Sequence, residues 1–215
     1  MPRGVLFIGG LSPRSDRILK ILHNGDLICA ADSGLDSAVS AGVRPHGVVG
    51  DMDSISDISL LRDFPADSIL MAPRDKDETD TELGLDWLRA RGACPLVLVG
   101  GGEGRLDHTL ALIKLFDSLE PPSIWYTALE EIKPVEGRCR IEGKKGDSVS
   151  FFPVGRGPWT AESQGLKWSL GNLDWSVETV SLSNRLLEDG GSVNVIQGRL
   201  LMLRPLSEAL ETFPD

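Results

Sequence analysis

The first residues suited to chemistry form the segment Gly50-Asp51-Met52-Asp53-Ser54. In an extended backbone, the side chains of Asp51 and Asp53 point to the same side. Two carboxylates about 4 Å apart repel each other by about 4 kcal/mol at an effective dielectric constant of 20. A bound cation removes this repulsion, and carboxylates completed by water and phosphate oxygens suit Mg²⁺. The alternative interpretation is a solvated acidic turn in which Ser54 caps a helix.

The second acidic segment includes Lys76 and Asp77 and ends on a capping box formed by Thr79 and Glu82. A helix N-terminus attracts anions, so Lys76 could contact a phosphate group there. Asp77 and Asp80 could join the metal cluster. The alternative is that the acids only complement the helix dipole, which explains Asp80 and Glu82 but not Lys76.

The third segment is a glycine-rich turn over residues 100–108, between a predicted strand and a predicted helix. Glycines such as Gly102 let a ligand approach the backbone closely, and Arg105 is suited to binding phosphate. The segment is neither a P-loop nor a dinucleotide-binding fingerprint, so an NAD-dependent oxidoreductase is disfavoured. Asp107 as a helix N-cap and His108 as a surface residue are the alternatives.

The elements that must position these segments are short apolar runs alternating with helical patterns over residues 1–131. Such alternation predicts a Rossmann-like α/β domain with a parallel sheet. Strands are predicted at Val5–Ile8, Leu27–Ala31, Gly47–Gly50, Ser68–Met71, Leu96–Val99 and Ile124–Thr127. Helices are predicted at Asp16–Leu22, Leu35–Ala41, after the Thr79 cap and from about Asp107.

The carboxyl ends of parallel strands lie on one edge of a sheet, where ligands of such folds bind. All three segments follow predicted strands, and so does Asp32 in the piece Ala31-Asp32-Ser33-Gly34. We therefore expect one site for a metal ion and phosphate at this edge.

The pattern changes in the second part of the chain, residues 132–215. No convincing helix is found between Lys144 and Leu206, which predicts a small antiparallel β-sandwich-like domain, with Glu130–Gly143 as the junction. The predicted strands are Ser148–Val154, Val177–Leu182, Val193–Ile196 and Leu200–Arg204, with Gln197-Gly198 as a hairpin turn between the last two.

Composition restricts the classes of partner. The 215 residues carry 22 basic and 32 acidic side chains, a formal net charge of −10. Such a chain repels nucleic-acid backbones, and it would bind a free nucleotide only with a cation or a local positive patch. No apolar run approaches the roughly 20 residues of a membrane span. The scattered cysteines Cys29, Cys94 and Cys139 favour reduced thiols in the cytoplasm.

Taken in order, these segments resemble the thiamin pyrophosphokinase family. The matching elements are Ala31-Asp32-Ser33-Gly34, Gly50-Asp51-Met52-Asp53-Ser54, Lys76-Asp77-Glu78-Thr79-Asp80, Gly104-Arg105-Leu106-Asp107-His108, Gly165-Leu166-Lys167-Trp168 and Ser181-Leu182-Ser183-Asn184. The resemblance implies an N-terminal domain that binds ATP and Mg²⁺, and a C-terminal domain that helps to bind thiamin. It also implies a homodimer, with thiamin held where the two subunits meet.

The resemblance further implies roles for individual residues. It implies that three acids bind the metal ion: Asp51, Asp53 and Asp80. It implies that five residues contact the nucleotide or the diphosphate: Asp32, Lys76, Asp77, Thr79 and Asp107. It implies that four residues bind thiamin: Trp168, Ser181, Ser183 and Asn184. Two residues depart from the family pattern: Ser33 stands where glycine is common, and Arg185 stands where an acidic or small residue is common.

The implied reaction is attack of the thiamin hydroxyl on the β-phosphorus of ATP, with AMP as the leaving group. Lys76 and Arg105 are candidates to stabilise the developing negative charge, and Asp80 or Asp53 is the candidate acceptor of the hydroxyl proton. The alternatives are a pyrophosphokinase acting on another hydroxymethyl compound such as a pterin, a metal-dependent phosphohydrolase, or a non-enzymatic sensor of thiamin or nucleotide.

Overall fold

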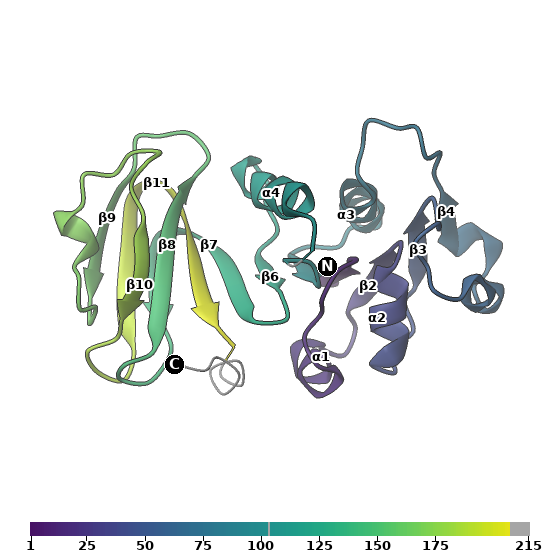
Figure 1. Ribbon diagram of the computed structural model, residues 1–215, viewed down its shortest axis with the longest axis horizontal. Coiled ribbons are helices and arrows are strands. Elements are labelled where there is room, and N and C mark those ends of the chain that lie inside the picture. The colour runs from purple at the N-terminus through teal and green to yellow at the C-terminus, as the bar shows by residue number, and fades with distance from the viewer. Residues whose placement is uncertain (103, 207–215) are drawn as a thin grey trace. The chain divides into compact units, whose positions relative to one another are not determined.

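A computed structural model describes residues 1–102 and 104–206 of the chain (Figure 1). These residues form two compact units: Met1–Leu110 with Pro122–Ala128, and Ala111–Pro121 with the chain from Leu129 onward. Residues 111–121 therefore pack with the second unit, whereas a division at residue 131 assigns them to the first. Glu103 of the glycine-rich turn and residues 207–215 of the predicted β domain lie outside the described residues.

The first unit is built on a parallel sheet with the strand order β6-β5-β1-β2-β3-β4. Its strands are β1 (Gly4–Phe7), β2 (Leu27–Ala31), β3 (Gly47–Gly50), β4 (Ile69–Met71), β5 (Leu96–Val99) and β6 (Ile124–Tyr126). The predicted strands are thus confirmed, with end points that differ by one residue at most.

Helices cover both faces of this sheet. They are α1 (Ser15–Ile21), α2 (Gly34–Ser40) and α3 (Asp80–Ala90), with 3₁₀ turns at Ile58–Asp63 and Ala66–Ser68. The helix α4 (Leu106–Lys114) begins in this unit, and its last residues and the 3₁₀ turn at Leu115–Asp117 belong to the second unit. Because side chains alternate along a strand, Val5 and Phe7 of β1 join the apolar cluster that contains α1 and α2. Leu6 faces the other way and packs against Gly84 of α3.

The order of the strands reverses direction at β1. The chain adds β2, β3 and β4 on one side of β1, and then returns through α3 to add β5 and β6 on the other side. Ligands of open α/β sheets bind at such a switch point, beyond the carboxyl ends of the strands. The predicted site segments all begin at these ends, so the topology brings them to one edge.

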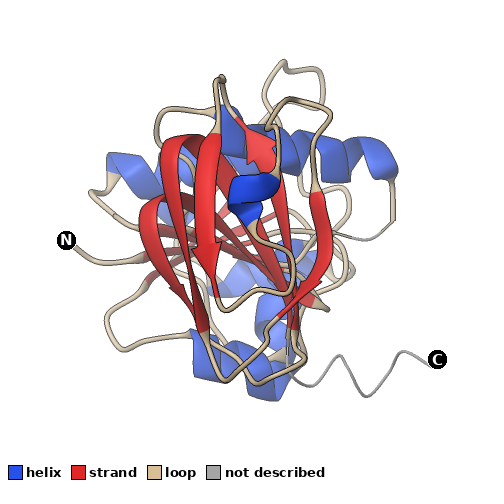
Figure 2. Cartoon of the chain, turned by 90° about the vertical axis from the view of Figure 1, so that its left-hand side faces the viewer, coloured by secondary structure: helices blue, strands red, loops and turns tan. Residues whose placement is uncertain are grey.

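The second unit is antiparallel and contains one apolar cluster. The strands pair in the order β10-β8-β11-β7, and β9 pairs with the first half of β11. Figure 2 looks onto this unit and shows its strands in red. They are β7 (Glu130–Ile141), β8 (Ser148–Val154), β9 (Thr160–Gln164), β10 (Ser181–Arg185) and β11 (Gly191–Pro205), with a 3₁₀ turn at Leu170–Asn172.

The hairpin predicted at Gln197-Gly198 is wrong. The two segments around it form the single strand β11, because both pair with β7 on either side of a register shift between Val195 and Leu200. Gly198 has a φ of 76°, and a Cβ there would lie 2.4 Å from the Trp159 side chain. Glycine at this position therefore marks a bulge inside a long strand rather than a chain reversal.

Three other expectations for this unit also differ from the structure. The predicted junction Glu130–Gly143 contains the long strand β7, and β9 was not predicted. The strand predicted at Val177–Leu182 lies at Ser181–Arg185 instead, and Val177 is exposed. These strands expose many polar residues, so their apolar pattern is weak in sequence. In the described part of the chain, no helix has the length and apolar character needed to cross a membrane.

Candidate active site

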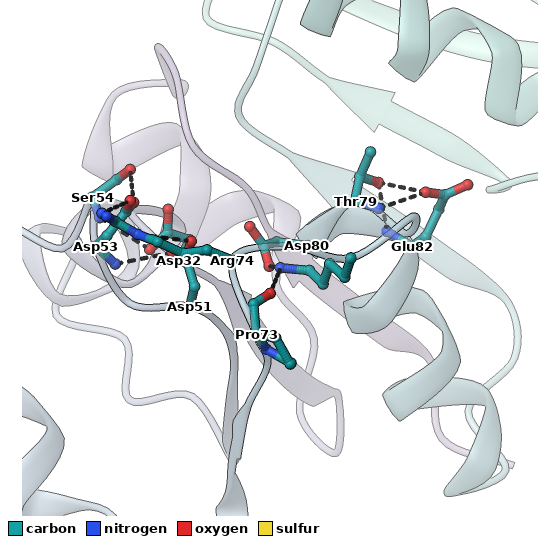
Figure 3. Close-up of polar contacts among 10 residues, drawn as sticks. Asp32, Asp51, Asp53, Ser54, Pro73, Arg74, Thr79, Asp80 and Glu82 are labelled. Carbon is teal, nitrogen blue, oxygen red and sulfur yellow. Dashed lines mark hydrogen bonds and ion pairs between the residues drawn. The ribbon is translucent and has the colours of Figure 1, made fainter.

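Three carboxylates meet at the carboxyl edge of the parallel sheet. Asp32 follows β2, Asp51 follows β3, and Asp80 is the first residue of α3. One oxygen from each lies within 4.8 Å of the others (Figure 3). The structure thus brings together three acids that are far apart in the sequence, and we call Asp32, Asp51 and Asp80 the acid trio.

Gly50 makes the space in which the acid trio meets. It ends β3 with a φ of 130°, a conformation that favours glycine. A Cβ atom at this position would lie 3.0 Å from Asp80 Oδ1 and 3.4 Å from the Asp32 Cβ. A larger residue would therefore push Asp80 and Asp32 apart, which explains why glycine precedes Asp51 in this segment.

The electrostatics of the acid trio are unfavourable without a cation. Burial raises the pKa of Asp32, and the charges of Asp80 and Asp51 raise it further. The Oδ1 atom of Asp80 is buried, and the Lys76 ammonium lies 3.0 Å from it. The three converging oxygens fit a divalent cation such as Mg²⁺, which takes carboxylate ligands.

Asp53 is arranged differently from the sequence-based expectation, because the backbone between it and Asp51 is not extended. Met52 has a φ of 65° and is buried, so the chain turns to place this side chain in the core. The amide of Asp53 donates to Asp51 Oδ1 at 3.1 Å. The hydroxyl of Ser54 donates to Asp53 and, with Arg74, holds the pKa of that carboxyl below its usual range. Asp53 therefore borders the acid trio instead of belonging to it.

Two cations from one segment neutralise these acids. Arg74 forms an ion pair with Asp53 and lies 3.6 Å from Asp51 (Figure 3). Lys76 pairs with Asp80. Lys76 was predicted as a phosphate contact, whereas Arg74 was missed. Arg74 could have been found from its position directly before an acidic segment in a chain of negative net charge.

The capping box at the start of α3 is present in the structure. Thr79 Oγ1 accepts a hydrogen bond from the Glu82 amide, and the Thr79 amide donates to the Glu82 carboxylate. The Thr79 hydroxyl also donates to the same carboxylate. The cap fixes where α3 begins and therefore fixes Asp80 next to Asp51. Asp77, which was predicted to contact the nucleotide, is exposed in the loop before the cap.

The glycine-rich turn after β5 lies on the same edge of the sheet. Gly102 has a φ of 85° and packs closely on Thr127, where a Cβ would lie 2.7 Å from Thr127 Cγ2. The guanidinium of Arg105 donates two hydrogen bonds to Asp107, at 3.2 and 2.6 Å. This pairing lowers the pKa of Asp107 to about 2. Arg105, which was predicted to bind phosphate, is therefore exposed but forms an ion pair with Asp107. Asp107 lies in the first turn of α4 rather than at its N-cap.

In the second unit, a hydrogen-bond network holds Trp168. Asn184 is fully buried: its side-chain oxygen accepts from the Trp168 amide at 3.1 Å, and its NH₂ group donates to the Trp168 carbonyl at 2.6 Å. The same NH₂ group donates to Ser181 Oγ at 3.1 Å. The Trp168 side chain is 52% exposed. Asn184, with Ser181 as a further partner, therefore holds the backbone of Trp168, whose side chain is exposed.

The other predicted residues of this region lie around the same network. Ser183 is exposed, has a φ of 52° and donates its amide to Ser150 Oγ at 2.9 Å. Arg185, which departs from the family pattern, donates to the carbonyl of Gly146. The Lys167 ammonium lies 4.5 Å from the centre of a Trp168 ring. The indole face of Trp168 can therefore accommodate a cation.

Comparison with known proteins finds one family for both units. Residues 18–124 match the description "Thiamin pyrophosphokinase, catalytic domain", and residues 138–200 match "Thiamin pyrophosphokinase, vitamin B1 binding domain". The thiamine pyrophosphokinase of Bacillus subtilis (strain 168) is 27% identical over 180 residues, which cover 80% of this chain and 84% of that protein.

Solved structures agree with this result at the level of the fold. The thiamine pyrophosphokinase from Bacillus subtilis superposes with a TM-score of 0.78 at 21% identity, covering 95% of this chain and 100% of that one. The yeast thiamin pyrophosphokinase superposes with a TM-score of 0.72 at 20% identity, covering 99% and 89%. The fold of the present chain is therefore the one seen in these enzymes.

Proposed function

The chain belongs to the thiamin pyrophosphokinase family, and we propose that it transfers a diphosphate group from ATP to the hydroxyl of thiamin, giving thiamin diphosphate and AMP. The observation that carries this proposal is the acid trio, which lies at the ligand-binding edge of the sheet within the match to the family's catalytic domain. A pterin pyrophosphokinase and a phosphohydrolase are not favoured, because the second unit matches the vitamin B1 binding domain.

Mg²⁺ belongs to the proposal as the cofactor. Asp32, Asp51 and Asp80 would hold it, with Asp53 beside them as a further predicted metal-linked acid. When bound, the ion would neutralise the charge of the ATP phosphates. The support for this assignment is the convergence of the three carboxylate oxygens and the mutual repulsion of these carboxylates.

The chain's own residues then position the two substrates. The thiamin oxygen attacks the β-phosphorus, the bond from that phosphorus to the α,β-bridging oxygen breaks, and AMP leaves with this oxygen. Lys76 and Arg105 are proposed to bind the transferred diphosphate and stabilise its charge. Asp80 or Asp53 is proposed as acceptor of the hydroxyl proton, and Ser54 and Arg74 make Asp53 the weaker base by holding its pKa below the usual range.

The nucleotide is proposed to bind along the same edge of the sheet. The assigned contacts are Asp32, Asp77, Thr79, Gly102 and Asp107. Support comes from the position of the glycine-rich turn directly after β5 and from the switch point beside β1. Thiamin is proposed to bind at the second unit, where the face of Trp168 suits its thiazolium cation. Ser183 is the exposed polar residue beside it.

A homodimer is part of the proposal. Apolar side chains are exposed on and around β10, which lies at the end of the strand order: Trp168, Val180, Leu182 and Leu187. Exposed apolar patches on an edge strand commonly mark interfaces. Light scattering of the purified protein should therefore give about twice the mass of one chain; a mass of one chain at assay concentration would remove the dimer from the proposal.

A cytoplasmic location completes the proposal. Cys29, Cys94 and Cys139 are free thiols, and burial raises the pKa of Cys29 to about 12. Unpaired cysteines suit the reducing compartment in which ATP is also supplied. Fractionation of the source cells with detection of the protein in the cytoplasmic fraction tests this assignment.

The test of the function is incubation with ATP and Mg²⁺, with and without thiamin, followed by separation of the nucleotides. AMP should appear only with thiamin, matched by an equal amount of thiamin diphosphate. ADP would indicate transfer of a single phosphoryl group, and nucleotide loss without an acceptor would indicate a hydrolase. Turnover of a pterin in place of thiamin would move the assignment to the related pyrophosphokinases.

A further inference from the structure

Arg74 is held next to the acid trio by the sheet itself. Gly50 at the end of β3 pairs with Met71 at the end of β4, and the amide of Ala72 donates to the Gly50 carbonyl at 2.9 Å. This bond extends the pairing one residue beyond β4. Arg74 therefore lies two residues after the hydrogen bond between Ala72 and Gly50, and opposite the segment that carries Asp51 and Asp53.

Arg74 contacts one carboxylate of the acid trio and one carboxylate beside it. Its guanidinium pairs with Asp53, and its Nε lies 3.6 Å from Asp51 Oδ2. Asp51 is a member of the acid trio, so Arg74 and a divalent cation would compete for the same charge. The Arg74 side chain is 72% exposed, so apolar packing does not fix it in this position.

From these contacts we propose that Arg74 is a further phosphate-binding residue of this site. In the nucleotide-free protein it neutralises Asp51 and Asp53; with Asp51 engaged in holding a metal ion, the guanidinium would turn to the ATP phosphates. A guanidinium suits both partners, because its planar N–H groups match carboxylate and phosphate oxygens alike. This inference rests on the proposed function for the identity of the donor, ATP.

The proposal predicts two effects of opposite sign for Arg74→Gln. Affinity for a metal ion in the absence of nucleotide should rise about five-fold, because an exposed competing ion pair has been removed. Affinity for the metal–nucleotide complex should fall about ten-fold or more, because a charged hydrogen bond to phosphate is lost. A merely structural role would weaken both.

The experiment uses the full chain. Mn²⁺ binding without nucleotide is measured by electron paramagnetic resonance, with Mn²⁺ standing in for Mg²⁺. Binding of α,β-methylene-ATP with Mg²⁺ is measured by calorimetry, because this analogue resists cleavage at the bond that the proposed reaction breaks. Arg62→Gln is the matched control: Arg62 is an exposed arginine of the same unit, and its charge acts on Asp57.

Tighter Mn²⁺ binding together with weaker analogue binding in Arg74→Gln, and not in Arg62→Gln, is the expected result. Changes in the same direction, no change, or equal changes in the control would overturn the proposal. Arg74→Lys should give a smaller loss of analogue affinity, since the charge remains. Neither binding assay contains thiamin, so a wild-type protein that makes no thiamin diphosphate would contradict the proposed function without deciding the role of Arg74.

Discussion

Replacing Asp51 with asparagine is expected to lower the rate of thiamin diphosphate formation by about a thousand-fold. Asp51 supplies one of the three converging oxygens of the acid trio. The neutral side-chain amide of asparagine would bind a divalent cation poorly. The loss should fall mainly on kcat at saturating ATP and Mg²⁺. Steady-state assay of AMP formation across a range of Mg²⁺ concentrations measures it.

The same substitution should leave the fold intact. An asparagine Oδ1 can still accept the hydrogen bond from the Asp53 amide, and the lost pairing with Arg74 is offset by less repulsion within the acid trio. The midpoint of urea denaturation should therefore stay near that of the wild-type protein. Lost activity with an unchanged midpoint assigns Asp51 to the chemistry rather than to folding.

Two further variants make the comparison specific. Asp57→Asn removes an exposed acid that caps a neighbouring 3₁₀ turn, and asparagine caps equally well, so activity should be retained. Asp53→Asn should cause a smaller loss than Asp51→Asn, because Asp53 lies outside the acid trio. Near-normal turnover of Asp51→Asn would remove the metal site from the proposed mechanism.

The second large effect is expected for Asn184→Ala, which should lower the free energy of unfolding by about 3 kcal/mol. The substitution removes the side-chain partners of the Trp168 amide and carbonyl and of the Ser181 hydroxyl. Because Asn184 is fully buried, water does not replace these bonds without opening the unit. Urea denaturation measures the change, and Asn172→Ala, at an exposed position, serves as the control.

Asn184→Ala should also raise the KM for thiamin, because Trp168 is no longer held. Trp168→Ala is the comparison: the exposed indole contributes little to stability, so the KM for thiamin should rise about ten-fold with little change in unfolding. The KM for ATP should stay near its wild-type value in both variants. If Asn184→Ala weakened thiamin binding while stability stayed unchanged, Asn184 would be a direct thiamin contact instead of a positioning residue.

Local features of the sequence were sufficient for the parallel half of the fold. Short apolar runs such as Leu96–Val99 and the capping box of Thr79 and Glu82 depend only on neighbouring residues, so they are visible in the chain itself. The sequence also determined that Asp32, Asp51 and Asp80 follow strands or begin a helix. These positions were enough to predict that the three acids lie at the same edge of the sheet. The order of the motifs along the chain was enough to predict the family.

Other features depended on contacts between distant residues, and only the tertiary structure decided them. The two halves of β11 form one strand because both pair with β7, although Gly198 interrupts the apolar pattern of the sequence. Burial of Met52 turns the backbone and separates Asp53 from the acid trio, which Asp32 joins instead.

Arg74 and Asn184 illustrate the same limit for side chains. Their partners lie 21 and 16 residues away, so their roles in neutralising Asp53 and in holding Trp168 follow from strand register and burial. The spacing of these residues along the chain does not predict either contact. The sequence determined which residue types reach the site, and packing determined which of them meet.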